Sequence, residues 1–291
     1  MSLNSGFDEV QACADADIAQ VRDARTRRDL FRRELPCFPD VIELRPSGSL
    51  ARGTHIDPIH DVDLVAVFSE SAHPKWGKPG GSAEEALEHA RKLIKDCLGS
   101  DGTGDVRHTR VQNHSVKCFL DDPDDPDAFT VNITPALVQV EGGILIPEKN
   151  NKRWVASDPQ FLMDEVARRH DAWKEFTKLV RVLKRWNRDH GKRMKDLVVE
   201  VLALTWLNEA DRPTALAQFF TAAAVAVWCP IRDPANLCGL IQPDLDKAGA
   251  HAALADAADH ANRALEAAAR DENSRAMCLW RKVFGPTFPE S

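Results

Sequence analysis

The sequence predicts an α+β fold in which a mixed sheet with flanking helices is followed by a helical lobe. In the first half of the chain, short apolar runs typical of strands alternate with helical patterns and loops rich in Pro or Gly. Beyond Asp158-Pro159 the apolar spacing is almost wholly helical. Because strands and helices segregate along the chain, we expect two lobes, residues 1–158 and 159–291. The helices expected in the second lobe are 160–190, 195–210, 214–227 and 248–270.

The elements of the first lobe follow from apolar spacing and from three prolines. Pro36, Pro46 and Pro135 each follow an apolar run and are expected to end it. Ser82 starts a helical pattern and has Glu85 three residues later, the arrangement of a capping box. The expected elements are one long amphipathic helix at 8–35, strands at 41–45, 62–68, 129–134 and within 105–120, and a helix at 82–97.

The acidic segment 121–127 resembles a calcium loop at first sight. It lacks the central Gly and terminal Glu of an EF-hand, and prolines interrupt it. We therefore expect a hairpin turn between two strands at this place.

Composition excludes some classes of protein. The net charge is −7, and the Lys and Arg clusters are interleaved with acids, so long nucleic acid is not an expected partner. No apolar run has the length of a membrane span, and the polar start is no signal peptide. Seven cysteines form no Cys-x-x-Cys pair, and their number is odd. Reduced thiols and a cytoplasmic location fit best.

Asp61 and Asp63 are two carboxylates at the start of an apolar strand. Side chains two apart in a strand point to the same face, so these two are aimed together. Adjacent like charges repel unless a cation lies between them. Because all the ligands are oxygens, the cation is expected to be Mg²⁺ or Mn²⁺. An isolated Asp-x-Asp is more often a solvated strand edge, so its neighbours decide the interpretation.

Gly48 and Ser49 precede this pair and follow a short strand-like run. A Gly-Ser turn lets backbone N–H groups approach a phosphate closely, and the Ser hydroxyl adds a donor. A strand, this turn, and a strand with two carboxylates together make a phosphate cradle beside a metal site. That is the arrangement needed to hold a nucleoside triphosphate with its Mg²⁺.

The string Gly-Ser-x-x-x-Gly-Thr followed by Asp-x-Asp resembles the polymerase-β-like nucleotidyltransferase superfamily. Within it, the string is similar to the branch of oligoadenylate synthetases, cyclic GMP–AMP synthase and the bacterial cyclic-oligonucleotide synthases (CD-NTases) of anti-phage signalling. The resemblance covers most of the chain. It implies a two-lobed fold with the long first helix packed against both lobes and a nucleotide cleft closed by the helical lobe. It also implies NTP substrates such as ATP, a cyclic nucleotide product, and a separate effector that the product activates.

Asn132 stands where the resemblance predicts the third metal ligand. The family string resembles Val-Asp-Val-Val-Pro-Ala, and this chain has Val131-Asn132-Ile133-Thr134-Pro135-Ala136. We expect Asn132 to point at the site with Asp61 and Asp63, and to offer a carbonyl oxygen without a charge. Metal and triphosphate binding should persist, whereas catalysis should fall. Three interpretations remain open: an introduced substitution that traps substrate, a natural variant that works slowly, and a natural nucleotide-binding pseudoenzyme.

Three basic residues are further candidate nucleotide ligands. Lys184 lies at the edge of an apolar helical stripe and reaches toward the interior. The ordinary interpretation of such a residue is a lysine at the rim of the core. Its string Leu-Val-Arg-Val-Leu-Lys-Arg-Trp-Asn resembles the family helix whose lysine binds the donor triphosphate, which favours a phosphate ligand. Lys195 resembles a second family lysine, although Asp196 replaces the Ser that usually follows. Arg52, in the loop after the Gly-Ser turn, is also expected to reach phosphates.

Two other functions remain as alternatives to a cyclic-oligonucleotide synthase. A non-catalytic nucleotide-binding sensor on the same fold would make Asn132 natural. A transferase acting on RNA or protein is less favoured, because the chain shows no concentrated basic run.

Overall fold

The computed structural model describes residues 3–99, 104–139 and 142–290 and divides into two compact units. The sheet unit comprises Asp17–Gly53 and Pro58–Met163. The helical unit draws its described residues from Met1–Ala16, Thr54–Asp57 and Asp164–Ser291. The predicted α+β class with a mixed sheet and a helical second half is confirmed.

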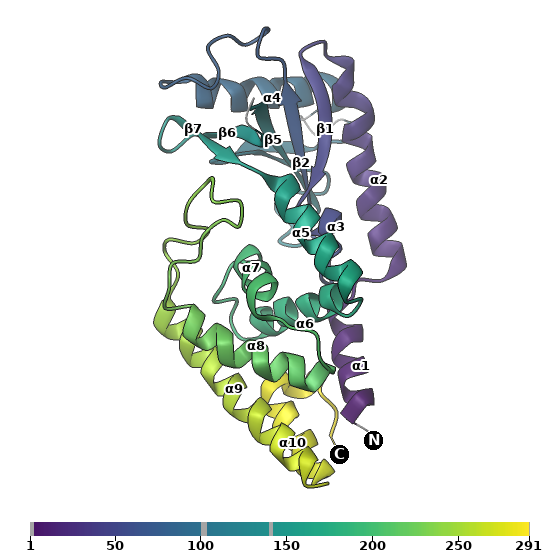
Figure 1. Ribbon diagram of the computed structural model, residues 1–291. Coiled ribbons are helices and arrows are strands. Elements are labelled where there is room, and N and C mark those ends of the chain that lie inside the picture. Colours follow the sequence, from purple (N-terminus) through teal and green to yellow (C-terminus); the bar gives the residue numbers. More distant parts are fainter. Residues whose placement is uncertain (1–2, 100–103, 140–141, 291) are drawn as a thin grey trace. The chain divides into compact units, whose positions relative to one another are not determined.

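The sheet unit is built on seven strands in which one pair, β2 and β5, is parallel. The order β1-β2-β5-β4-β3 runs across the sheet, and β6 and β7 form a ribbon on the far end of β5 (Figure 1). The strands are β1 (Val41–Ser47), β2 (Asp61–Phe68), β3 (His108–Val111), β4 (Val116–Phe119), β5 (Thr130–Val138), β6 (Ile144–Glu148) and β7 (Arg153–Ser157). The ribbon of β6 and β7 was not predicted, because its short strands lack a clear apolar alternation.

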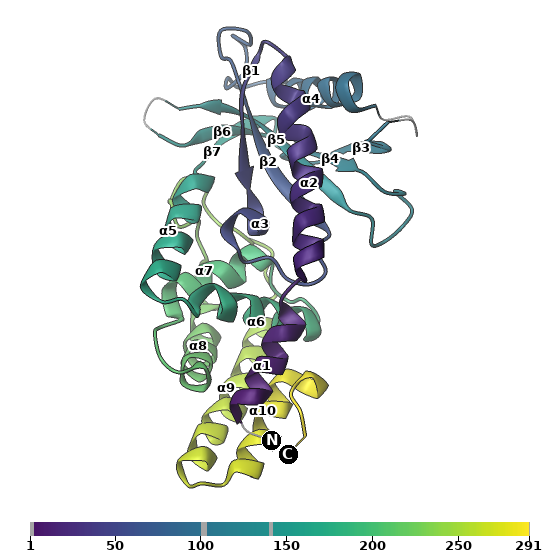
Figure 2. The same cartoon turned by 90° about the vertical axis from the view of Figure 1, so that its right-hand side faces the viewer.

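One face of this sheet carries the main core of the unit. Helices α2 (Ile18–Glu34) and α4 (Ser82–Leu98) cover it (Figure 2). The side chains of every second strand residue belong to the core cluster on this face. On β2 these residues are Val62, Leu64, Ala66 and Phe68. The alternate residues of β2 therefore face the other way, and the first of them are Asp61 and Asp63.

Pro46 and Pro135 lie inside strands rather than ending them, which corrects the prediction. Pro46 is tolerated because β1 is at the edge of the sheet. Pro135 lies where β5 changes its neighbour, since β5 pairs with β4 at residues 130–133 and with β6 at residues 137–138. A proline there removes no hydrogen bond from either ladder.

The predicted helix over residues 8–35 is two helices, α1 (Leu3–Ala14) and α2 (Ile18–Glu34), followed by the short 3-10 helix η1 (Leu35–Cys37). Asp17 is the N-cap of α2, and its carboxylate accepts a hydrogen bond from the backbone N–H of Gln20 at 2.8 Å. This local bond starts a new helix and interrupts the old one. The two helices also belong to different units.

The expected helix at 82–97 is confirmed as α4, but its capping box is not. Gly81 is the N-cap, and the Ser82 hydroxyl instead donates to the carbonyl of Lys78 at 3.0 Å. The acidic segment 121–127 connects the antiparallel strands β4 and β5, so the predicted hairpin turn is confirmed.

The helical unit contains the second half of the chain. The predicted helix at 160–190 is broken at residues 173–175, and α10 lies beyond the last predicted helix. In the part of the chain that the structure describes, no helix is both long enough and apolar enough to cross a membrane. The helices are α5 (Pro159–Ala172), which starts in the sheet unit, α6 (Phe176–Asp189), α7 (Asp196–Trp206), α8 (Arg212–Ala226), α9 (Lys247–Ala269), α10 (Asn273–Phe284) and η2 (Gly285–Thr287).

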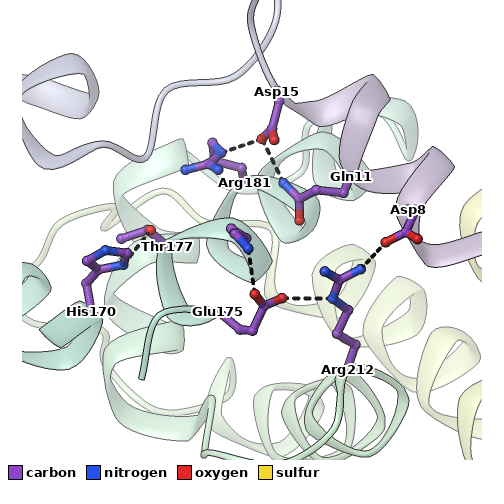
Figure 3. A network of polar contacts seen from close by, with 9 residues as sticks. Asp8, Gln11, Asp15, His170, Glu175, Thr177, Arg181 and Arg212 are labelled. Carbon is purple, nitrogen blue, oxygen red and sulfur yellow. Dashed lines mark hydrogen bonds and ion pairs between the residues drawn. The ribbon is translucent and has the colours of Figure 1, made fainter. Parts of the chain in front are cut away.

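Helix α1 is held to the helical unit by a network of ion pairs (Figure 3). Arg212 of α8 donates to Asp8 of α1 at 2.6 Å and to Glu175, the N-cap of α6, at 2.8 Å. Asp15, just beyond α1, accepts hydrogen bonds from Gln11 and from Arg181 of α6. The first helix is thus fixed by charge as well as by the burial of Phe7.

Candidate active site

A row of polar side chains crosses the sheet on the face opposite the main core. The strand register pairs Ser47 with Asp63, Asp63 with Asn132, Asn132 with Lys117, and Lys117 with Arg110. Directly paired residues of neighbouring strands place their side chains on the same face. The row therefore joins five strands and has the acidic pair of β2 close to one end.

Asp61 and Asp63 lie two apart in β2, on this face, as the sequence predicted. Asp61 is exposed, and Asp63 is half-buried. Strand β5 pairs in parallel with β2 and places Thr130 opposite Asp61 and Asn132 opposite Asp63. Both carboxylates therefore lie beside the same strand, β5. Further along β2, Val65 and Val67 continue this face into a small apolar cluster with Ala136 and Ile144.

Gly48 brings the backbone of the preceding segment against the carboxylate of Asp63. The predicted Gly-Ser turn is a short helix, α3 (Gly48–Arg52), that follows β1 directly. Gly48 has φ +72°, and a Cβ atom added there would lie 2.0 Å from Oδ2 of Asp63. Only glycine allows both this backbone conformation and this close approach. Ser49 is the next residue and Arg52 the last one of the same helix, so both belong to the segment that Gly48 sets against Asp63, and their phosphate roles stay predictions.

Asn132 points at this site, as predicted, and contacts Asp63 directly. Its Nδ2 donates to Oδ1 of Asp63 at 3.1 Å. Its own Oδ1 is buried and has no hydrogen-bond partner. Two carboxylates and an unpartnered amide oxygen form a set of hard oxygen ligands, so these residues fit Mg²⁺ or Mn²⁺.

Lys117 and Arg110 are two cations on the face of Asp63 that were not predicted from the sequence. They extend the row beyond Asn132 on β4 and β3. Both cations lie over the ring of Phe119, Lys117 Nζ at 5.2 Å and Arg110 Cζ at 5.6 Å from the ring centroid. The alternation of residues within 108–119 indicates that Arg110 and Lys117 point away from the core. Only the strand register shows that they share the face of Asp63. The row thus changes from acidic to basic across the sheet.

Lys184 is fully buried in the helical unit. Its ammonium group forms an ion pair with Glu200 of α7 and donates to the carbonyl of Thr54 at 2.9 Å. The hydroxyl of Thr54 donates to Glu200 at 2.9 Å. The side chains of Lys184 and Glu200 are each 1% exposed, so Lys184 is not at the rim of the core. Its phosphate role stays a prediction, and the structure shows a second role as the partner of a buried carboxylate.

Lys195, the other lysine of the prediction, is the N-cap of α7. It is exposed, and its backbone N–H donates to the side chain of Gln242 at 2.8 Å. Within the helical unit, nothing assigns its ammonium group to a phosphate, so this role also stays a prediction.

Comparison with known proteins gives whole-length likenesses, although no protein-family model matches the chain. A probable cyclic nucleotide synthase of Bacillus cereus (strain VD146) is 23% identical and is matched over 99% of this chain and 98% of the relative. A cyclic AMP-AMP-AMP synthase of Escherichia coli (strain MS 115-1) is 24% identical, with 84% of this chain and 82% of the relative covered.

Solved structures give the same result for the fold. The structure of CdnC of Escherichia coli MS115-1 with ATP superposes with a TM-score of 0.75 at 19% identity and covers 99% of both chains. That of the CD-NTase CdnG of Bradyrhizobium diazoefficiens with GTP gives a TM-score of 0.70 at 14% identity, over 97% of this chain and 96% of that one. The chain thus has the two-lobed α+β fold of a class of nucleotidyltransferases. By sequence the chain is similar to proteins named cyclic nucleotide synthases, and by fold it is similar to the bacterial CD-NTases.

Proposed function

We propose that this protein is a nucleotidyltransferase that makes a cyclic di- or oligonucleotide from NTPs. The observation that carries the proposal is the contact of Gly48 with Asp63, which sets a short backbone turn against the Asp61–Asp63 pair. The likeness to cyclic nucleotide synthases over 84–99% of the chain supports this chemistry. The proposed setting is the cytoplasm, where the product would activate a separate effector in anti-phage signalling.

Each part of the sheet face has a role in this proposal. Asp61, Asp63 and Asn132 would hold Mg²⁺ or Mn²⁺, which when bound would neutralise charge on the triphosphate. Gly48 and Ser49 would contact the triphosphate with backbone N–H groups and the Ser hydroxyl. Arg52, the last residue of the same short helix, would also contact the phosphates. The family resemblance assigns Lys184 and Lys195 to the triphosphate as well.

The basic end of the row suits the second nucleotide. Lys117 and Arg110 are the cations that follow Asn132 across the sheet. We propose that they bind phosphate groups of the acceptor or of the growing chain, because charge-assisted hydrogen bonds to phosphate are among the strongest in proteins.

The reaction is a phosphoryl displacement. A 2′- or 3′-hydroxyl oxygen of one nucleotide forms a bond to the α-phosphorus of another, and the bond to the β-phosphate oxygen breaks, so pyrophosphate leaves. The hydroxyl proton must pass to a base. An Asp at position 132 would supply negative charge beside that hydroxyl, and Asn132 does not. We therefore propose that this chain binds NTP and turns it over slowly.

A second candidate function is a nucleotide-binding sensor without catalysis. The hydrogen bond from Asn132 to Asp63 favours it, because the neutral amide stabilises the site without requiring turnover. Both functions predict NTP binding, and only the first predicts a product.

The test supplies the chain and its Asn132→Asp variant with labelled NTPs and Mg²⁺ or Mn²⁺, and separates the products. We expect NTP binding by both proteins, with cyclic product and pyrophosphate formed faster by the variant. An Asp63→Asn change in the Asn132→Asp background is the control that should form neither. If both proteins bind NTP and neither releases pyrophosphate with any NTP mixture, the sensor is the better description. If neither binds NTP, both proposals fail.

A further inference from the structure

We infer that Asp40, His73 and His89 form a second metal site, which binds a divalent transition metal such as Zn²⁺. The three side chains come from three separate segments of the sheet unit and converge on one point. The site goes beyond the proposed transferase function and does not depend on it.

The ligand atoms are already close together. Nε2 of His73 lies 2.9 Å and Nε2 of His89 lies 2.6 Å from Oδ2 of Asp40. One candidate ligand atom from each residue falls within 4.8 Å of both others. Two imidazole nitrogens and a carboxylate oxygen are a common ligand set for Zn²⁺, with water as the fourth ligand. Metal–ligand distances of about 2.0–2.1 Å require only a small opening of this cluster.

The two imidazoles share a single carboxylate oxygen rather than using one oxygen each. This shared oxygen holds the three candidate ligand atoms together in one group, as a metal site requires. Burial of Asp40 opposes its ionisation, but the hydrogen bonds from His73 and His89 outweigh it and lower the pKa of this carboxyl. Metal binding would release the Nε2 protons that both imidazoles donate to Asp40.

Aromatic side chains surround the two imidazoles of this cluster. The ring of Trp76 stacks on His73 at a centroid distance of 3.7 Å, and Phe68 packs edge-on against both His rings. Aromatic walls fix the orientation of ligating imidazoles and limit access of water. The His89 side chain is nevertheless 29% exposed, so a metal ion and one water molecule can enter from the solvent.

The site is remote from the carboxylates of the candidate active site. Asp40 directly precedes β1, and the pair Val41–Phe68 begins the ladder of β1 and β2. The pair Ser47–Asp63 ends the same ladder. Six residues of strand separate the two ends by about 20 Å. A metal at Asp40 would therefore join the start of β1, the loop that carries His73, and helix α4, rather than take part in the transfer reaction.

The test measures binding of Co²⁺ and Zn²⁺ to the metal-stripped protein with Asp61→Asn and Asp63→Asn, which removes the other candidate site. We expect one equivalent of Co²⁺ with visible absorption typical of nitrogen and oxygen ligands, its displacement by Zn²⁺, and a rise in the thermal midpoint with either metal. His73→Gln, His89→Gln and Asp40→Asn should each weaken binding at least about tenfold. His108→Gln, a change at an exposed histidine on β3, should bind like the parent.

Three results would overturn the site. The first is no binding of Co²⁺ or Zn²⁺ to the folded parent at 100-fold molar excess of metal. The second is undiminished binding by all three ligand variants. The third is equal loss of binding in the His108→Gln control. If a His variant fails to fold, as circular dichroism would show, the isosteric Asp40→Asn variant decides the matter.

Discussion

The side-chain amide of Asn132 donates to the carboxylate of Asp63, with 3.1 Å between Nδ2 and Oδ1. This hydrogen bond stabilises the carboxylate of Asp63, as a bound metal ion would. A carboxylate at position 132 would instead bring two like charges to hydrogen-bond distance. The residue at this position therefore decides whether the site is stable by itself or depends on a cation.

Asn132→Asp should lower the stability of the metal-free protein and increase its need for a cation. Losing the hydrogen bond and adding a repulsion should reduce the free energy of unfolding by about 1–3 kcal/mol. Mn²⁺ with an NTP should restore the thermal midpoint of the variant more than that of the parent, and turnover should rise on the order of 100-fold. Asn132→Ala is the control for the loss of the amide alone. An equal effect of Mn²⁺ on parent and variant would contradict this account.

Gly48→Ala and Gly53→Ala form a matched pair that isolates the contact with Asp63. Both glycines have positive φ, at +72° and +69°, so each substitution should cost about 1 kcal/mol of backbone strain. An added Cβ meets Oδ2 of Asp63 at 2.0 Å in the first case and nothing within 4 Å in the second. Gly48→Ala should therefore be destabilised by about 1–3 kcal/mol more and lose NTP binding, while Gly53→Ala keeps it. Chemical denaturation and NTP titration would show this, and equal losses in both variants would exclude a role for the contact.

Local sequence rules predicted the active-site half of the sheet well. Asp61 and Asp63 are found on one face because strand alternation is a local property. Asn132 joins them because β5 pairs with β2 in parallel, which no local pattern encodes. The family resemblance implied only that the side chain at position 132 points at the site. The same resemblance did not indicate Lys117, whose place in the row depends on the pairing of β4 with β5.

The errors have physical causes that lie outside the local pattern. In the sequence, Asp17 is one polar residue within a helical pattern, but in the structure its carboxylate caps the start of a new helix. Pro135 ends a strand by local rules, but the change of neighbouring strand leaves its missing N–H without consequence. The burial of Lys184 depends on Glu200, sixteen residues away, and on Thr54, which is far away in the sequence. The last two depend on tertiary structure that overrides a local preference, whereas the cap at Asp17 is a local bond that the helical pattern did not indicate.

Variants of Lys184 and Glu200 separate the structural role of this lysine from the predicted phosphate role. Lys184→Met alone and Glu200→Gln alone should each destabilise the protein, Lys184→Met by about 3–5 kcal/mol, because one partner stays buried without its counter-charge. The double change Lys184→Met with Glu200→Met should recover most of that loss. If the folded double variant binds NTP like the parent, the lysine is purely structural. Weaker NTP binding by a double variant of normal stability would support the phosphate role.

The network around Glu175 should make the helical unit sensitive to acid. Burial opposes ionisation of Glu175, but hydrogen bonds from Lys178 and Arg212 outweigh it, so its pKa is below the ordinary 4.5. A lowered carboxyl pKa contributes stability that is present above the unfolded-state pKa and is lost as the pH falls through the folded-state value. Glu175→Gln should therefore cost about 1 kcal/mol at pH 7 and reduce the loss of stability between about pH 5 and pH 3. Denaturation at a series of pH values measures this, with Glu266→Gln, a change at an exposed position of α9, as the control. A stability difference between Glu175→Gln and the parent that stays constant down to pH 3 would show that the carboxylate does not act through its charge.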